Sequence, residues 1–143
     1  MIASVNEPTL VQAAKEAGAN GINLVGMCCS GAEVLVRHGI PHAGNFMSTE
    51  TILVTGAVDA MTVDVQCIKQ GLVKVADCYE TPLITTNPRC KIEGATHIEF
   101  HEHTPKECTD EIVIRAIGIH KQRISIDVST TGPPPANIRE ASH

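Results

Sequence analysis

The chain has 143 residues, and its 11 lysines and arginines against 16 aspartates and glutamates give a formal net charge of −5. This length suits one domain, and an apolar content of 43% excludes wholesale disorder. The acidic balance argues against a nucleic-acid-binding protein, and an aromatic content of 2% is too low for a stacking platform for single strands.

The first half of the chain alternates between helix and strand signals. Pro8 is an acceptable first helical residue, and an apolar stripe follows it with helical spacing. The apolar run over 22–27 predicts a buried strand. Ser30 and Glu33 form the S-x-x-E pattern of a capping box, which predicts a helix that begins at Ser30 and ends at Gly39.

The second half continues the alternation and defines the fold class. The further elements expected are a helix after Ser48, a strand over 61–65, a helical stripe over 68–79, strands over 83–86 and 97–100, and a helix capped by Thr109. This order predicts an α/β fold, a Rossmann-like, doubly wound and mostly parallel sheet with flanking helices. From Ile124 the pattern fails and three consecutive prolines follow, so we expect a domain over 1–123 and a flexible, proline-rich tail over 124–143.

The sequence also carries signals about compartment. Asn6 and Glu7 interrupt the N-terminus before an apolar signal-peptide segment could form. No apolar run reaches the roughly 18–20 residues of a membrane span. We therefore expect a cytoplasmic protein without a membrane span, whose cysteines are metal ligands or buried thiols rather than disulfides.

Cys28 and Cys29 are the most informative residues, because they fall between a predicted strand and a predicted helix. Ligands of open α/β sheets bind beyond the carboxyl ends of the strands, and a helix N-terminus stabilises a thiolate. A thiolate at this place could be a nucleophile or a metal ligand. The alternative is a buried thiol in a crowded turn.

Cys67 occupies the equivalent place after the next predicted strand, so parallel strands could bring Cys29 and Cys67 to one edge of the sheet. Iron–sulfur clusters need several such thiolates from different loops. The alternative for Cys67 is a cysteine in the core.

A zinc site built from His101, His103 and Cys108 matches no standard spacing, so a solvated loop is the favoured interpretation there. Cys78 and Cys90 have no partner spacing and are expected to be buried thiols.

Two long blocks carry a family resemblance. GINLVGMCCSGAEVLVRHGIP over 21–41 and TGAVDAMTVDVQCI over 55–68 closely resemble the catalytic subunit of anaerobic, nickel-dependent carbon monoxide dehydrogenases, in the superfamily shared with hybrid-cluster proteins. Residues 13–86 follow the family almost continuously, and 94–120 follow it more loosely. The Cys-Cys-Ser-Gly-x-Glu-Val-Leu-x-Arg-His-Gly block is long and unusual, so the match is specific.

The resemblance implies the central Rossmann-like domain of a larger oxidoreductase, one that converts CO and water to CO2, two protons and two electrons on a nickel–iron–sulfur cluster built on a 4Fe-4S-type core. Cys29 would ligate the iron outside the cubane, and Cys67 an iron of the cubane part. No catalytic residue is assigned, and no role is assigned to Cys28 or His38 or to the three remaining cysteines.

The same resemblance implies an incomplete ligand set, because the family takes a histidine from upstream of this region and further cysteines from a later domain. We therefore expect a fragment that is inactive alone and is completed by missing domains or by a cysteine-rich partner chain, with a homodimer as a further expectation. Two alternatives remain open: a non-catalytic anion- or metal-binding module, and a subunit that completes its site with a partner. Every interpretation in which the chain is a fragment of a larger protein or complex predicts exposed apolar surface.

Overall fold

The computed structural model describes residues 1–65 and 69–129, with side chains up to residue 124. Its α-helices are α1 (Ile2–Val5), α2 (Pro8–Glu16), α3 (Cys28–Ser30), α4 (Thr49–Val54), α5 (Leu72–Cys78) and α6 (Pro105–Ser129). The strands are β1 (Gly26–Met27), β2 (His42–Gly44), β3 (Met61–Val63), β4 (Leu83–Thr85) and β5 (Thr96–His97). Shorter helical turns are the π-helix η1 (Gly31–Leu35) and the 3-10 helices η2 (Val36–His38), η3 (Phe46–Ser48) and η4 (Pro88–Cys90).

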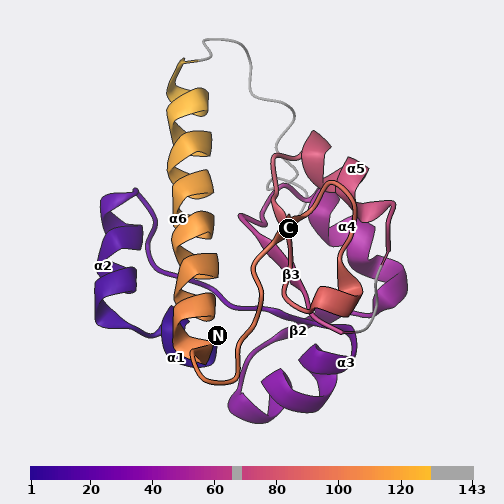
Figure 1. Cartoon of the computed structure of the whole chain (residues 1–143). Helices are drawn as coiled ribbons and strands as arrows, with labels where there is room; N and C mark the ends of the chain where they lie inside the picture. The colour runs from indigo at the N-terminus through magenta and orange to yellow at the C-terminus, as the bar shows by residue number, and fades with distance from the viewer. Residues whose placement is uncertain (66–68, 130–143) are drawn as a thin grey trace.

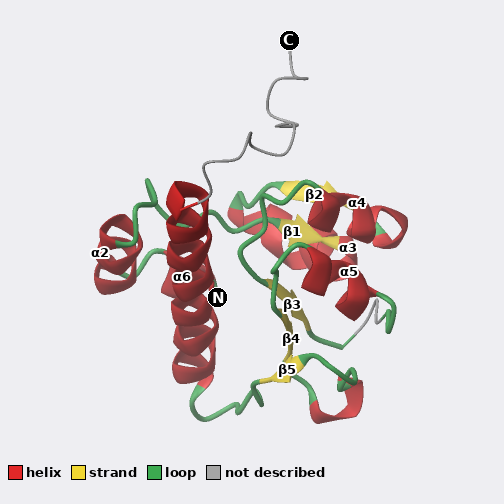
Figure 2. Cartoon of the chain, turned by 90° about the horizontal axis from the view of Figure 1, so that it is seen from above, coloured by secondary structure: helices red, strands yellow, loops and turns green. Residues whose placement is uncertain are grey.

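All strand pairs in the described part of the chain are parallel. β1 pairs with β2, and β3, β4 and β5 form a second ladder in that order. Figure 2 shows the strands following one another across the molecule in the order β2, β1, β3, β4, β5. This order is that of a flavodoxin-like doubly wound sheet, in which β1 and β3 flank the point where the winding reverses. The α/β fold with parallel strands is therefore confirmed.

Helices cover both faces of the β3–β5 ladder, as a doubly wound sheet requires. Successive side chains of a strand point to opposite faces. Leu83 packs with Leu53 of α4 and Leu72 of α5, whereas the next residue, Ile84, packs with Ile112 of α6. A strand buried on both faces explains why the sequence of β4 is a continuous run without polar alternation.

The long helix α6 also packs on its other side against the N-terminal helices. Val113 forms a cluster with Val5 of α1 and Leu10 of α2. The hydroxyl oxygens of Ser4 and Thr109 are 2.7 Å apart and hydrogen-bonded. Figure 1 shows α1 and α2 beside α6, with the strands on the far side of that helix. α6 therefore joins the two parts of the molecule.

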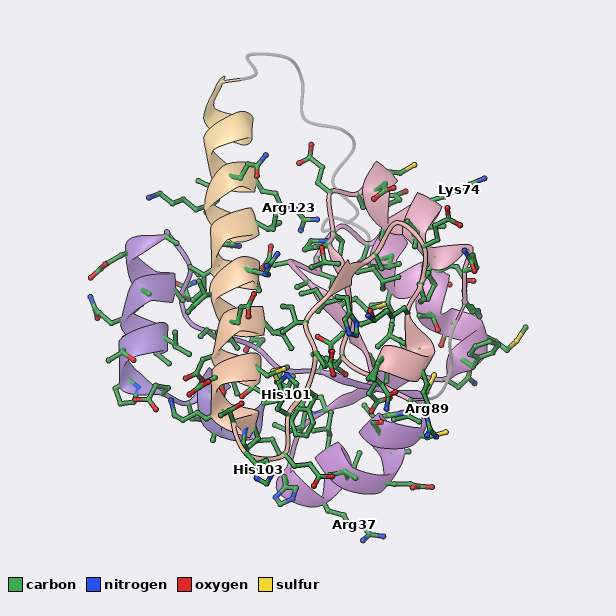
Figure 3. All side chains as sticks on the ribbon, in the orientation of Figure 1. Arg37, Lys74, Arg89, His101, His103 and Arg123 are labelled. Atoms are coloured by element: carbon green, nitrogen blue, oxygen red, sulfur yellow. The ribbon has the colours of Figure 1, made fainter. Side chains whose placement is uncertain are left out.

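Arg123 of α6 connects this helix to the amino ends of two strands. Its guanidinium donates to the carbonyl of Val58 (2.8 Å), a carboxylate oxygen of Asp59 (3.2 Å) and the hydroxyl of Thr81 (2.9 Å), and also to the carbonyl of Tyr79. Figure 3 shows the labelled Arg123 side chain extending from α6 toward the strands. These acceptors precede β3 and β4, so Arg123 lies at the edge opposite the carboxyl ends.

The predicted boundaries are wrong at both ends of α6. The helix begins at Pro105 rather than at Thr109, since proline is favoured in the first helical turn. It continues to Ser129, so the proposed domain boundary after residue 123 falls inside a helix. Arg123 and Ile124 still contact the rest of the molecule there, which extends the packed region beyond the periodic apolar pattern. Residues 130–143 of the proposed tail over 124–143 lie outside the described residues. No helix in the described ranges combines the length and the apolar character that crossing a membrane requires.

Candidate cysteine site at the carboxyl edge of the sheet

Cys28 and Cys29 lie where the sequence predicted, at the end of β1 and the start of a helix. β1 ends at Met27, α3 begins at Cys28, and the helix continues through a π-helical turn and a 3-10 turn to His38. The Cys29 side chain is exposed. Cys28 has a φ of +53°, in the left-handed region that non-glycine residues rarely adopt. Such strain and π-helical turns are both frequent at functional sites.

Two glycines allow this turn to close tightly. A Cβ atom on Gly31 would lie 2.6 Å from the carbonyl carbon of Gly26 and 2.8 Å from the His42 ring. A Cβ on Gly26 would in turn lie 2.7 Å from the Cα of Gly31. The backbone before the cysteines therefore packs directly against the backbone after them, which places both cysteines at the tip of the turn.

Neighbouring strands hold the turn on two sides. From β2, the Nε2 of His42 lies 3.3 Å from the carbonyl oxygen of Cys28. From the end of β3, a carboxylate oxygen of Asp64 accepts a hydrogen bond from the Ser30 hydroxyl at 2.8 Å. The cysteine turn is thus attached to the strands on either side of β1.

The predicted capping box at Ser30 and Glu33 is wrong. The helix starts two residues earlier, with Met27 as its N-cap, and the Ser30 backbone is already helical. Its hydroxyl is used in the bond to Asp64 instead of capping a backbone N–H. Gly39 does end the helical segment in the left-handed conformation, as expected.

Cys67, the second predicted ligand, lies outside the described residues, but the chain on either side of it is placed. Asp64 precedes it at the end of β3, and Lys69 follows it. The Lys69 ammonium donates to both carboxylate oxygens of Glu50, at 2.8 and 2.9 Å, and lies 4.2 Å from the centre of the Phe46 ring. This hydrogen bond lowers the pKa of Glu50. Both flanks of the Cys67 segment are therefore anchored to α3 and to the η3–α4 region.

Cys90 lies at the same edge, although its spacing in the sequence predicted no partner. It ends η4, directly after β4, and its thiol donates to the carbonyl of Val65 at 3.5 Å. It is buried, as predicted. The signal that could have found its place is the one used for Cys29, a cysteine shortly after the carboxyl end of a predicted strand.

The two remaining cysteines lie apart, on α5 and α6, and Cys108 lines one pocket together with His97 and His101. Cys78 is exposed on α5, so its prediction as a buried thiol is wrong. Cys108 is buried, and burial raises the pKa of its thiol. Figure 3 shows His101 and His103 near the start of α6. Among the side chains that the structure describes, in residues 1–65 and 69–124, no three His, Cys, Asp or Glu residues are grouped closely enough to hold a metal ion.

Fold and site together define a Rossmann-like α/β domain with an exposed cysteine at the point where the winding of its strands reverses. Residues 1–135 match the model of the Prismane/CO dehydrogenase family, and the chain belongs to that family. The resemblance seen in the sequence is confirmed.

Named relatives give the degree of similarity. The chain is 54% identical over 111 residues to carbon monoxide dehydrogenase 1 of Carboxydothermus hydrogenoformans, covering 77% of this chain and 18% of the relative. It is 46% identical over 117 residues to carbon monoxide dehydrogenase 1 of Methanosarcina mazei, covering 82% of this chain and 19% of the relative. The chain thus spans about a fifth of the length of these relatives, as the fragment interpretation predicts.

Solved structures agree with this. Carbon monoxide dehydrogenase IV from Carboxydothermus hydrogenoformans has a TM-score of 0.80 at 47% identity. The match covers 85% of this chain and 19% of the chain in that structure. A structure of NiZn[Fe4S4] and NiNi[Fe4S4] clusters in closed and open alpha subunits of acetyl-CoA synthase/carbon monoxide dehydrogenase has a TM-score of 0.83 at 45% identity, with coverages of 88% and 18%.

Proposed function

We propose that this chain supplies part of the ligand set of a nickel–iron–sulfur cluster in a carbon monoxide dehydrogenase. The enzyme would oxidise CO with water to CO2, two protons and two electrons. The observation that carries the proposal is the position of Cys29, exposed at the carboxyl edge between β1 and β3 and tied to the end of β3 through Ser30. Cys67, on the segment that follows β3, is proposed as the second ligand.

The donor chemistry fits such a group, but the number of donors does not complete it. Thiolates suit soft, redox-active metals. The described part of the chain contains no group of three potential ligands, so Cys29 and Cys67 need further ligands from other polypeptide. Without them a cluster would stay open to water and oxidation.

The residues of this chain would act by holding and orienting one wall of the site. When bound, the cluster supplies nickel for the carbonyl group and iron for the water-derived hydroxide. Cys29 holds its thiolate at the tip of a rigid turn, because Gly26 and Gly31 pack backbone against backbone. His42 and Asp64 restrain that turn from both sides. This arrangement presents the Cys29 side chain on a turn that is held from both sides.

Exposed apolar side chains support completion by further polypeptide. Val34 and Val36 follow Cys29 on the same helical segment and are 53% and 47% exposed, and Met47 is 79% exposed. Where exposed apolar residues form a large contiguous patch, that patch marks a surface that binds other protein. We propose that missing domains of the same protein or a cysteine-rich partner chain cover these residues, and that the assembly is a homodimer. A cytoplasmic location and CO, CO2 and water as substrates belong to the same proposal.

The test is a graft of the matched 111-residue segment into carbon monoxide dehydrogenase 1 of Carboxydothermus hydrogenoformans, assayed anaerobically by viologen reduction under CO. We expect an active graft. Cys29→Ala should lower the rate by about a hundredfold or more, because it removes a metal ligand. Cys28→Ala is the matched control in the same turn and should retain most activity.

Two further outcomes decide the assignment. If Cys28→Ala abolishes activity and Cys29→Ala does not, the ligand is assigned one residue too late. The isolated chain should retain no nickel after anaerobic desalting and reduce no viologen under CO. CO-dependent reduction by the isolated chain would contradict the proposed incompleteness.

A further inference from the structure

The winding of the strands reverses between β1 and β3. There, a hydrogen bond between two side chains joins segments whose described strands share no backbone ladder. In the part of the chain that the structure describes, β1 pairs with β2 and β3 pairs with β4, and no ladder joins β1 to β3. The hydrogen bond from the Ser30 hydroxyl to a carboxylate oxygen of Asp64, at 2.8 Å, crosses this gap. The two residues are separated by 34 positions in the sequence, so the bond joins two different loops.

The two carboxylate oxygens of Asp64 accept hydrogen bonds from two different donors. One carboxylate oxygen accepts from the backbone N–H of Val65 at 2.5 Å, and the other accepts from Ser30. The first bond sets the orientation of the carboxylate on its own loop, which leaves the second oxygen aimed at the cysteine turn. A hydrogen bond to a charged carboxylate is stronger than one between neutral groups.

Ser30 directly follows Cys29, so a displacement of Ser30 moves the thiol. The cysteine turn is also held on its other side by His42, at the carbonyl of Cys28. With both contacts the turn is fixed relative to β2 and to β3. With only the His42 contact it would follow β2 and its distance from the end of β3 would vary.

We propose that Ser30 and Asp64 are a positioning pair that sets the place of the Cys29 thiol relative to the loop after β3. This inference rests on the proposed function, because it assumes that the Cys29 thiol is a ligand of a metal cluster. It assigns roles to two exposed polar residues that are outside the proposed ligand set. Neither residue would touch the substrate.

The first experiment measures amide hydrogen exchange of the whole chain, unsubstituted and as Ser30→Ala, Asp64→Ala and Ser30→Thr. We expect Ser30→Ala to raise exchange about threefold in both loops, 27–31 and 62–65, since one shared bond is lost. The denaturant midpoint should not change, because an exposed bond contributes little to global stability. Ser30→Thr retains the hydroxyl and should behave like the unsubstituted chain. Exchange that rises only in the loop carrying the substitution would overturn the proposal.

The second experiment follows cadmium(II) binding anaerobically through the ultraviolet absorption of cadmium–thiolate bonds. Cys29→Ser defines the part of the signal that depends on Cys29. We expect Ser30→Ala and Asp64→Ala to weaken this part by about threefold, the double variant to be no weaker than either single one, and Ser30→Thr to restore it. Unchanged affinity in both alanine variants would overturn the positioning role. If the unsubstituted chain shows no signal that depends on Cys29, the proposed function fails, and the exchange experiment still decides whether the pair couples the loops.

Discussion

Replacing Arg123 with alanine is expected to lower the free energy of unfolding by about 3 kcal/mol, because it removes a mostly buried guanidinium and leaves several acceptors without their donor. The side chain of Arg123 is 18% exposed, and its hydrogen bonds reach the segments before both β3 and β4. Its partner Asp59 also lies 3.2 Å from the Nδ1 of His120. Urea-induced unfolding followed by circular dichroism measures the change.

Arg115 provides the matched control on the same helix. It forms an ion pair with Glu111 one helical turn away, and both side chains are about half exposed, at 47% and 50%. Arg115→Ala should change the free energy of unfolding by less than about 0.5 kcal/mol. Equal effects of the two substitutions would show that α6 is not held to the strands through Arg123.

Gly31→Ala is expected to destabilise the chain by about 1–3 kcal/mol, because the added methyl group meets backbone that cannot rotate away. The new Cβ would lie 2.6 Å from the carbonyl carbon of Gly26. The turn would have to open, which also displaces Cys29 from the sheet edge. Thermal unfolding reports the loss of stability, and the rate of alkylation of Cys29 reports the local change.

Gly118 is the corresponding control for glycine in a helix. Nothing lies within 4 Å of a Cβ built there, and the residue is in the interior of α6. Gly118→Ala should therefore stabilise the chain by about 0.5–1 kcal/mol through helix propensity alone. A destabilising Gly118→Ala, or a neutral Gly31→Ala, would contradict the packing described for the cysteine turn.

The sequence was informative wherever a regular pattern and a burial pattern coincide. Residues 83–86 were predicted as a strand of a mostly parallel sheet, and the structure has β4 there, with Leu83 and Ile84 buried in different core clusters. Proline at the start of α2 and glycine at the end of η2 marked helix ends correctly, since each has one strong backbone preference. The strand β2 (His42–Gly44) and the short helix α1 (Ile2–Val5) were not predicted, and the predicted strands over 22–27, 61–65, 83–86 and 97–100 were longer than β1, β3, β4 and β5.

Side-chain hydrogen bonds between distant loops could not be predicted in the same way. Ser30 had the local pattern of a helix cap, and a tertiary bond to Asp64 replaced that role. The C-terminal part of α6 was also missed. Arg123 in this part of the helix binds acceptors that lie far away in the sequence and carry no periodic signal. Local patterns therefore predicted the position of Cys29, but not the contacts that hold it.

The proposed cluster site requires that Cys29 and Cys67 meet at one edge of the sheet, and cross-linking tests this directly. The anaerobic chain would be treated with a short bifunctional thiol reagent, digested and analysed by mass spectrometry, with exposed Cys78 as an internal reference for unspecific reaction. We expect a link between Cys29 and Cys67 as the main intramolecular product, formed under native conditions and lost in urea. Links from Cys29 to Cys78 in its place, or no link from Cys29 at all, would contradict the shared site.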